Sequence, residues 1–129
     1  MTAGLLLLLA SQALSPVVAF QDPFFIFFDL GSAEVGAEQS ALVKNAATAV
    51  RLAGSNQLEV VGSADRQGSS VSNLRLSWRR ANAVRSALIA SGVPATVITV
   101  NGRGEDFPIV ATKDGIGHAQ NRYVTIMIR

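Results

Sequence analysis

Short apolar runs alternate with segments of helical periodicity along this chain, and this alternation constrains the fold most. Apolar residues recur at helical spacing over 37–53 and 71–90, and a glycine follows each segment. Four runs are typical of strands: 24–29, 58–61, 97–100 and 122–128. The predicted order is β-α-β-α-β-β, with a long loop before the last strand. Since such crossovers are right-handed, we expect an α/β (α+β) two-layer sandwich, a mixed sheet covered by two helices on one face.

The first part of the chain has the pattern of a secretory leader. The chain of 129 residues is long enough for one domain with a hydrophobic core and too short for two. No charged side chain precedes Asp22, an apolar run occupies 5–10, and small residues end at Ala19. We therefore expect a signal peptide over 1–19 and a mature domain over 20–129. An uncleaved membrane anchor and a buried N-terminal helix are the alternatives, although polar residues interrupt a run that would need about 20 apolar residues to span a bilayer.

The composition excludes several classes of site. There is no cysteine, so disulfides, thiolate metal sites and thiol catalysis are excluded. The net charge of +2 and the pI of about 9.7 suit an anionic polymer as partner, but the chain lacks the basic tracts of nucleic-acid-binding arms. No grouping of His, Asp and Glu has metal-ligand spacing, and His118 in its glycine-rich loop is expected at the surface. We expect no cofactor, no metal, no nucleic acid and no membrane span in the mature chain.

One arginine falls within the apolar arc of the 71–90 helix. At about 100° per residue, Arg80 lies among the apolar positions, whereas Arg75, Arg79 and Arg85 point to the solvent side. A buried charge without a partner costs several kcal/mol, so Arg80 must be paired. Asp65, in the loop before the helix, is the candidate. Two interpretations stay open: a structural Asp65–Arg80 salt bridge, or a clamp whose carboxylate takes a ligand ammonium and whose guanidinium takes a ligand carboxylate.

Five separated motifs, all in the same order, resemble those of the OmpA-like peptidoglycan-binding domain family. Residues 62–68, Gly-Ser-Ala-Asp-Arg-Gln-Gly, are similar to the family pattern Gly-His-Thr-Asp-x-x-Gly. Residues 73–81, Asn-Leu-Arg-Leu-Ser-Trp-Arg-Arg-Ala, are similar to Asn-x-x-Leu-Ser-x-x-Arg-Ala. The remaining matches are Phe27-Phe28-Asp29 with Ser32-Ala33-Glu34, Gly102-Arg103-Gly104-Glu105 with Pro108, and Asn121-Arg122. The similarity covers nearly all of the predicted mature chain.

This resemblance implies noncovalent binding of peptidoglycan through the diaminopimelate residue of the stem peptide, without catalysis. Carried over by position, Asp65 and Arg80 would hold the ammonium and the carboxylate of that residue. Asn73 and Asp29 would line the pocket, and Arg122 would close it. The family also implies a periplasmic protein that is associated with the cell wall or the outer membrane. The domain would tether or localise the protein at the cell wall.

The sequence departs from the family pattern at four positions. Ser63 and Ala64 stand where the family usually has histidine and threonine, Tyr123 replaces an arginine, and Gly31 replaces an acidic residue. The first three departures keep a second hypothesis open, in which the domain is a periplasmic protein-interaction adaptor with a decayed pocket. Its exposed face of Arg75, Arg79 and Arg85 would then bind an acidic partner. A hydrolase has no support, because no nucleophile elbow of the Gly-x-Ser-x-Gly kind is present.

Overall fold

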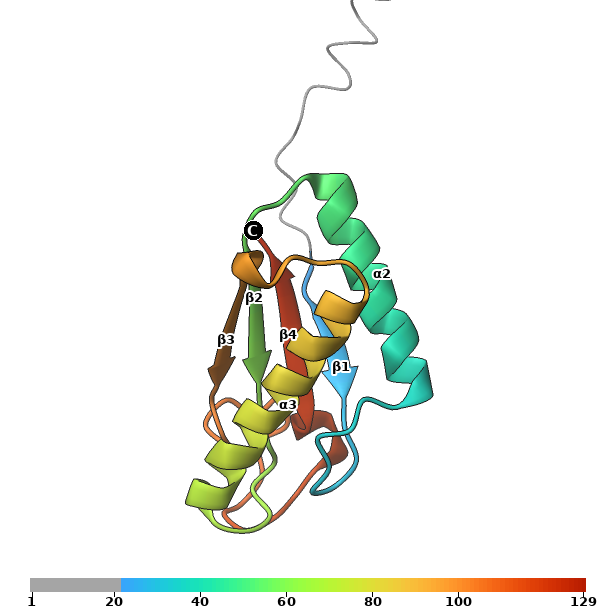
Figure 1. Cartoon of the computed structure of the whole chain (residues 1–129). Coiled ribbons are helices and arrows are strands. Elements are labelled where there is room, and N and C mark those ends of the chain that lie inside the picture. The colour runs from blue at the N-terminus through green and yellow to red at the C-terminus, as the bar shows by residue number, and fades with distance from the viewer. Residues whose placement is uncertain (1–21) are drawn as a thin grey trace, which may run out of the picture.

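The computed structural model describes residues 22–129, which form one sheet and two long helices in the predicted order (Figure 1). The predicted leader and its cleavage site at Ala19 lie outside the described residues. The strands are β1 (Phe24–Phe27), β2 (Leu58–Gly62), β3 (Ile98–Gly102) and β4 (Tyr123–Ile128). The helices are α2 (Ala37–Ala53) and α3 (Ser70–Ala90), with short 3-10 helices η1 (Ala95–Val97) and η2 (Ala119–Asn121). Each predicted strand and helix exists, and its ends differ from the prediction by at most two residues.

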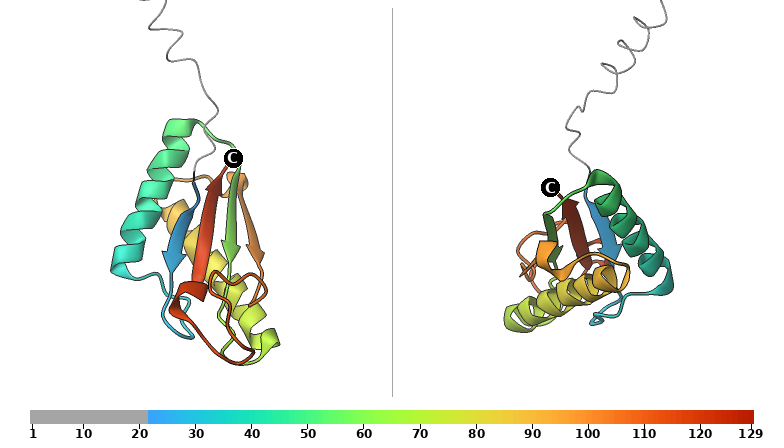
Figure 2. Two further views of the ribbon diagram at one scale, coloured as in Figure 1. Left: turned by 180° about the vertical axis from the view of Figure 1, so that it is seen from behind. Right: turned by 45° about the horizontal axis from the view of Figure 1, so that its top comes forward.

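The four strands form a mixed sheet in the order β1-β4-β2-β3. Strand β4 pairs antiparallel with both β1 and β2, and β2 pairs parallel with β3. Val60 marks the register, because it lies opposite Val100 on one side and Ile126 on the other. Both long helices lie on the same face of the sheet, as the views in Figure 2 show. The predicted two-layer fold is therefore confirmed.

The core lies between this face of the sheet and the two helices. Branched side chains of the central strands meet small and branched residues of the helices. The fully enclosed members are Ile26, Val60, Val124, Ile126, Ala46, Ala47, Ala81, Val84 and Leu88. Each large apolar side chain buried in this way contributes about 1.5–3 kcal/mol to folding. The alanines leave room for the helices to approach the strands closely.

Two glycines bring α3 directly onto the carboxyl ends of β2 and β3. A Cβ atom at Gly62 would overlap the backbone carbonyl oxygen of Ser77, and one at Gly102 would lie 2.6 Å from a ring carbon of Trp78. Only glycine permits the contact at Gly62, because the obstacle there is backbone. The first half of α3 is thereby fixed beside the loop that follows β2.

The long segment between β3 and β4 lies past the end of the sheet at which β2 and β3 finish, beside the start of α3 (Figure 2). The hydroxyl of Tyr123 donates to the carbonyl of Phe107 at 2.7 Å. The side-chain amide of Asn121 accepts from the backbone nitrogen of Val110 at 2.9 Å and donates to its carbonyl at 2.7 Å. These bonds hold an irregular segment in place without a regular element. Over 22–129, neither helix combines the length and the apolar character that a bilayer crossing requires.

Candidate ligand-binding site

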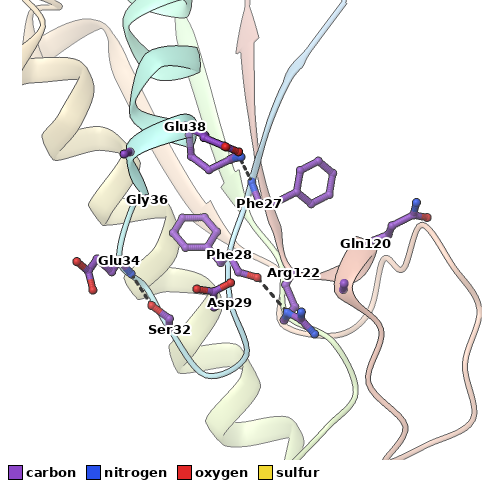
Figure 3. A pocket seen from close by; sticks show the side chains of 12 residues that line it. Phe27, Phe28, Asp29, Ser32, Glu34, Gly36, Glu38, Gln120 and Arg122 are labelled. Carbon is purple, nitrogen blue, oxygen red and sulfur yellow. Dashed lines mark hydrogen bonds between the residues drawn. The ribbon is translucent and has the colours of Figure 1, made fainter.

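Two neighbouring cavities open where β1 and β2 end and α3 begins. The smaller, of about 530 Å³, we name the Asp65 cavity. It is lined by Leu30, Gly31, Asp65, Gln67, Ser72, Asn73, Arg75, Leu76 and Arg79. The larger, of about 770 Å³, we name the Phe27 cavity, and Figure 3 shows it between the end of β1, the start of α2 and Gln120. It is lined by Phe27, Phe28, Asp29, Ser32, Glu34, Gly36, Ala37, Glu38, Gln39, Ala119, Gln120 and Arg122.

Arg80 lines neither cavity and has no exposed surface. Its Nε donates to the carbonyl of Ser32 at 2.8 Å, and its two terminal nitrogens donate to the carbonyls of Ser63 and Asp29, each at 3.1 Å. Its guanidinium also lies over the ring of Phe28, 5.3 Å from the ring centre. The partners that a buried arginine requires are thus backbone carbonyls. Through them Arg80 ties the β1–α2 turn to the end of β2.

Burial lowers the pKa of Arg80 to about 10, because the charged form loses its hydration. Attraction to Asp65 opposes this shift, and repulsion by Arg122 and Arg79 adds to it. A pKa of about 10 is still well above neutrality, so the guanidinium remains charged at physiological pH. A buried positive charge is therefore bonded to Asp29 and Ser32, two residues that line the Phe27 cavity.

Asp65 forms its ion pair with Arg122. The Nη1 of Arg122 donates to Oδ2 of Asp65 at 3.2 Å, and the Nε of the same arginine donates to the carbonyl of Phe28 at 3.0 Å. The other carboxylate oxygen of Asp65 accepts from the backbone nitrogen of Gln67 at 3.2 Å. Gly117 lies against this carboxylate, because a Cβ there would be 2.6 Å from Oδ2. The structural Asp65–Arg80 salt bridge that the sequence left open is therefore wrong.

Asn73 stands at the start of α3, on the wall of the Asp65 cavity. Ser69 caps the helix, since its hydroxyl accepts from the backbone nitrogen of Ser72 at 3.1 Å. The side-chain amide of Asn73 donates to Glu105 at 3.3 Å, which links α3 to the loop after β3. Only 4% of Asn73 is exposed, so packing holds the residue in place on the cavity wall.

The five predicted site residues come together, but they divide between the two cavities. Asp65 and Asn73 line the Asp65 cavity, Asp29 and Arg122 line the Phe27 cavity, and Arg80 lines neither. Because Arg122 lines one cavity and pairs with a residue of the other, this ion pair lies where the two cavities meet.

Sequence reasoning missed several residues of the Asp65 cavity. Leu30, Leu76, Arg75 and Arg79 line it, although the two arginines were expected to be ordinary solvent-facing residues. Both are exposed as predicted, yet their side of α3 borders the cavity. Their spacing of four residues, with an inward leucine between them, was the only signal in the sequence.

Two of the four positions that depart from the family pattern lie outside both cavities. Ser63 and Ala64 are 2% and 3% exposed, and neither lines a cavity. Within residues 22–129, the buried hydroxyl of Ser63 has no hydrogen-bond partner. In the part of the chain that the structure describes, no group of three His, Cys, Asp or Glu side chains is arranged to hold a metal.

Comparisons with known proteins identify a family for this chain. The OmpA family model matches residues 27–122. An outer membrane protein of Gluconacetobacter diazotrophicus is 32% identical over 111 residues, which are 81% of this chain and 29% of that protein. Outer membrane protein A of Bordetella avium is 32% identical over 102 residues, which are 79% of this chain and 53% of that protein. This chain therefore spans about half or less of the length of these curated relatives.

Solved structures give the same result. The peptidoglycan-associated lipoprotein from Burkholderia pseudomallei superposes with a TM-score of 0.73 and 27% identity, over 90% of this chain and 95% of that chain. The cell wall anchor of the T6SS from Pseudomonas aeruginosa superposes with a TM-score of 0.66 and 30% identity, over 79% of this chain and 73% of that chain. Both cover most of the described fold.

Proposed function

This chain belongs to the OmpA family, and we propose that it binds peptidoglycan noncovalently, as a cell-wall module without catalytic activity. Two similar structures support the proposal by their descriptions, one as a peptidoglycan-associated lipoprotein and one as a cell wall anchor. Relatives described as outer membrane proteins support a place in the cell envelope. We propose a periplasmic domain that tethers or localises its protein at the cell wall.

The ligand group that fits the site is the free end of diaminopimelate in the stem peptide. That end carries an ammonium and a carboxylate on one carbon, at the end of a short aliphatic chain. A buried carboxylate can bind the ammonium, and apolar surface beside it can contact the aliphatic chain. Asp65 is 4% exposed, and Leu30 and Leu76 line the same cavity. In our proposal Asp65 accepts from the ligand ammonium, while the leucines contact the aliphatic chain and Asn73 bounds the cavity.

Arg80 supplies the matching positive charge. Three of its N–H groups donate to backbone carbonyls, which leaves one N–H on each terminal nitrogen for a planar carboxylate. The β1–α2 turn, with Asp29 and Ser32, lies over this guanidinium. In our proposal a ligand carboxylate reaches Arg80 when this turn shifts and gives up its bonds to the guanidinium, and Arg122, directly before β4, then closes the site.

The observation that carries this proposal is a buried carboxylate and a buried guanidinium held by different partners. Asp65 is paired with Arg122 and Arg80 with the chain itself, so each can take a ligand charge without first breaking a bond to the other. Such a site suits a ligand with both charges at one end.

Co-sedimentation with purified diaminopimelate-containing sacculi tests the proposal. We expect the wild-type chain to pellet with sacculi and the Asp65→Asn variant to remain in the supernatant. Circular dichroism should show that this variant is still folded. Loss of one charged contact in a partly buried site costs about 2–5 kcal/mol, enough to remove most pelleting. Wild-type protein that stays in the supernatant would contradict the proposal and favour the adaptor hypothesis.

A further inference from the structure

Arg75 and Arg79 form an exposed pair of cations on the wall of the Asp65 cavity. They are four residues apart in α3, so their side chains lie on the same side of the helix. Both line the cavity, and both are exposed. Among residues 22–129, the three ion pairs join Arg66 to Glu105, Arg122 to Asp65 and Arg129 to Glu59, so neither Arg75 nor Arg79 has an acidic partner there.

The charges around the cavity do not balance. Asp65 is its only acidic lining residue, and Arg122 already pairs with that carboxylate. Arg75 and Arg79, both exposed, then add two positive charges to its lining, and the buried charge of Arg80 is close enough to be repelled by Arg79. Like charges four residues apart on a helix disfavour each other by about 0.2–0.5 kcal/mol. A ligand with net negative charge would relieve this repulsion.

The free end of diaminopimelate does not provide that negative charge, because its ammonium and its carboxylate cancel. The next residue of the stem peptide does. It is a γ-linked D-glutamate, whose α-carboxylate is either free or converted to an amide. We propose that Arg75 and Arg79 bind this second carboxylate, so that the site prefers stem peptides with a free glutamyl carboxylate over amidated ones.

This inference rests on the proposed function and adds a specificity to it. Arg75 and Arg79 would bind the carboxylate of the D-glutamate, while Asp65 and Arg80 bind the free end of the diaminopimelate residue. Helical geometry separates the two pairs, because Arg79 and Arg80 project in directions about 100° apart. The two groups of the ligand can therefore be varied one at a time.

The test is a titration of the chain with two stem tripeptides that differ in one group. One is L-alanyl-γ-D-glutamyl-diaminopimelate, and the other carries isoglutamine in place of glutamate. At low salt we expect the free acid to bind about tenfold more tightly, a ratio that falls as salt screens the exposed arginines. The double substitution Arg75→Gln and Arg79→Gln should abolish this preference while leaving the affinity for the amidated peptide within about twofold. Arg85→Gln, on the same helix but away from the cavity, is the matched control and should keep the preference.

The outcomes separate this inference from the proposed function. If the wild-type chain binds neither tripeptide, the proposed function fails. If it binds both equally and the double variant behaves as wild type, the second carboxylate is not recognised, and only the present inference is overturned. A poly-glutamate peptide that binds as tightly as the free-acid tripeptide would assign the arginines to an acidic protein partner and would also overturn it.

Discussion

The carboxylate of Asp65 is held by Arg122, with Nη1 and Oδ2 3.2 Å apart, although these residues are far apart in the sequence. Arg122 also donates to the carbonyl of Phe28, so one side chain fixes the end of β1 and the loop after β2. Asp65 thus has a fixed orientation before any ligand arrives. Such preorganisation lowers the cost of binding, because fewer groups must be ordered.

Arg80→Ala should destabilise the domain by about 3 kcal/mol. The substitution removes three charge-assisted hydrogen bonds and leaves buried carbonyls without a donor. Urea unfolding measures the effect. Arg79→Ala is the matched control on the next residue, and its exposed side chain should change stability by no more than about 0.5 kcal/mol. An Arg80→Ala variant as stable as wild type would mean that Arg80 does not anchor the β1–α2 turn.

The Asp65–Arg122 pair should show a coupling of about 1–3 kcal/mol in a double-mutant cycle. Arg122→Ala leaves a nearly buried carboxylate without its cation, whereas the same change beside Asp65→Asn does not. The free energies of unfolding of wild type, Arg122→Ala, Asp65→Asn and the double variant give this coupling. Additive effects would show that the pair contributes nothing to folding.

Gly62→Ala should weaken folding by more than about 2 kcal/mol. The new methyl group would overlap the carbonyl oxygen of Ser77, so α3 would have to move away from β2. Thermal unfolding is a sufficient measurement. Gly36→Ala is the control, because a Cβ there meets nothing within 4 Å and the loss should stay below about 1 kcal/mol. Equal losses in the two variants would contradict the proposed close contact.

Ser63→Ala should be neutral or should stabilise the domain by up to about 1 kcal/mol. The Ser63 hydroxyl is buried without a partner, and its removal ends the cost of keeping it from water. Its backbone carbonyl, which accepts from Arg80, is unchanged. Chemical denaturation distinguishes this result from a loss of about 1 kcal/mol or more, which would reveal a hydrogen bond at Ser63 that the static structure lacks.

The fold was predictable because its signals are local. Helical periodicity and the glycine stop after Ala53 gave α2 its observed ends. The inward position of Arg80 followed from the geometry of a single helix. Its partners did not, because they are backbone carbonyls of a turn 48 residues away at Ser32 and of the loop after β2. A sequence pattern can suggest a charged side chain as the partner of an arginine. It cannot single out a backbone carbonyl, because every residue has one.

The two cavities were not predictable for a related reason. Periodicity assigns the faces of a helix, but it does not tell what lies beside each face. Arg79 is exposed, as its place on the helix predicts, and it borders a cavity only because the β1–α2 turn packs beside α3. Likewise Asp29 and Asp65 belong to adjacent motifs of one predicted pocket, yet they face different cavities.

Competition with soluble stem peptides tests the central claim most directly. Sacculus-bound chain is titrated with L-alanyl-γ-D-glutamyl-diaminopimelate and with the same tripeptide ending in L-lysine, whose side chain has the ammonium but not the carboxylate. The account predicts that the diaminopimelate peptide releases the chain at a concentration at least about tenfold lower than the lysine peptide does, since only the former engages both Asp65 and Arg80. Equal release by the two peptides, or none by either, would contradict recognition of the diaminopimelate end.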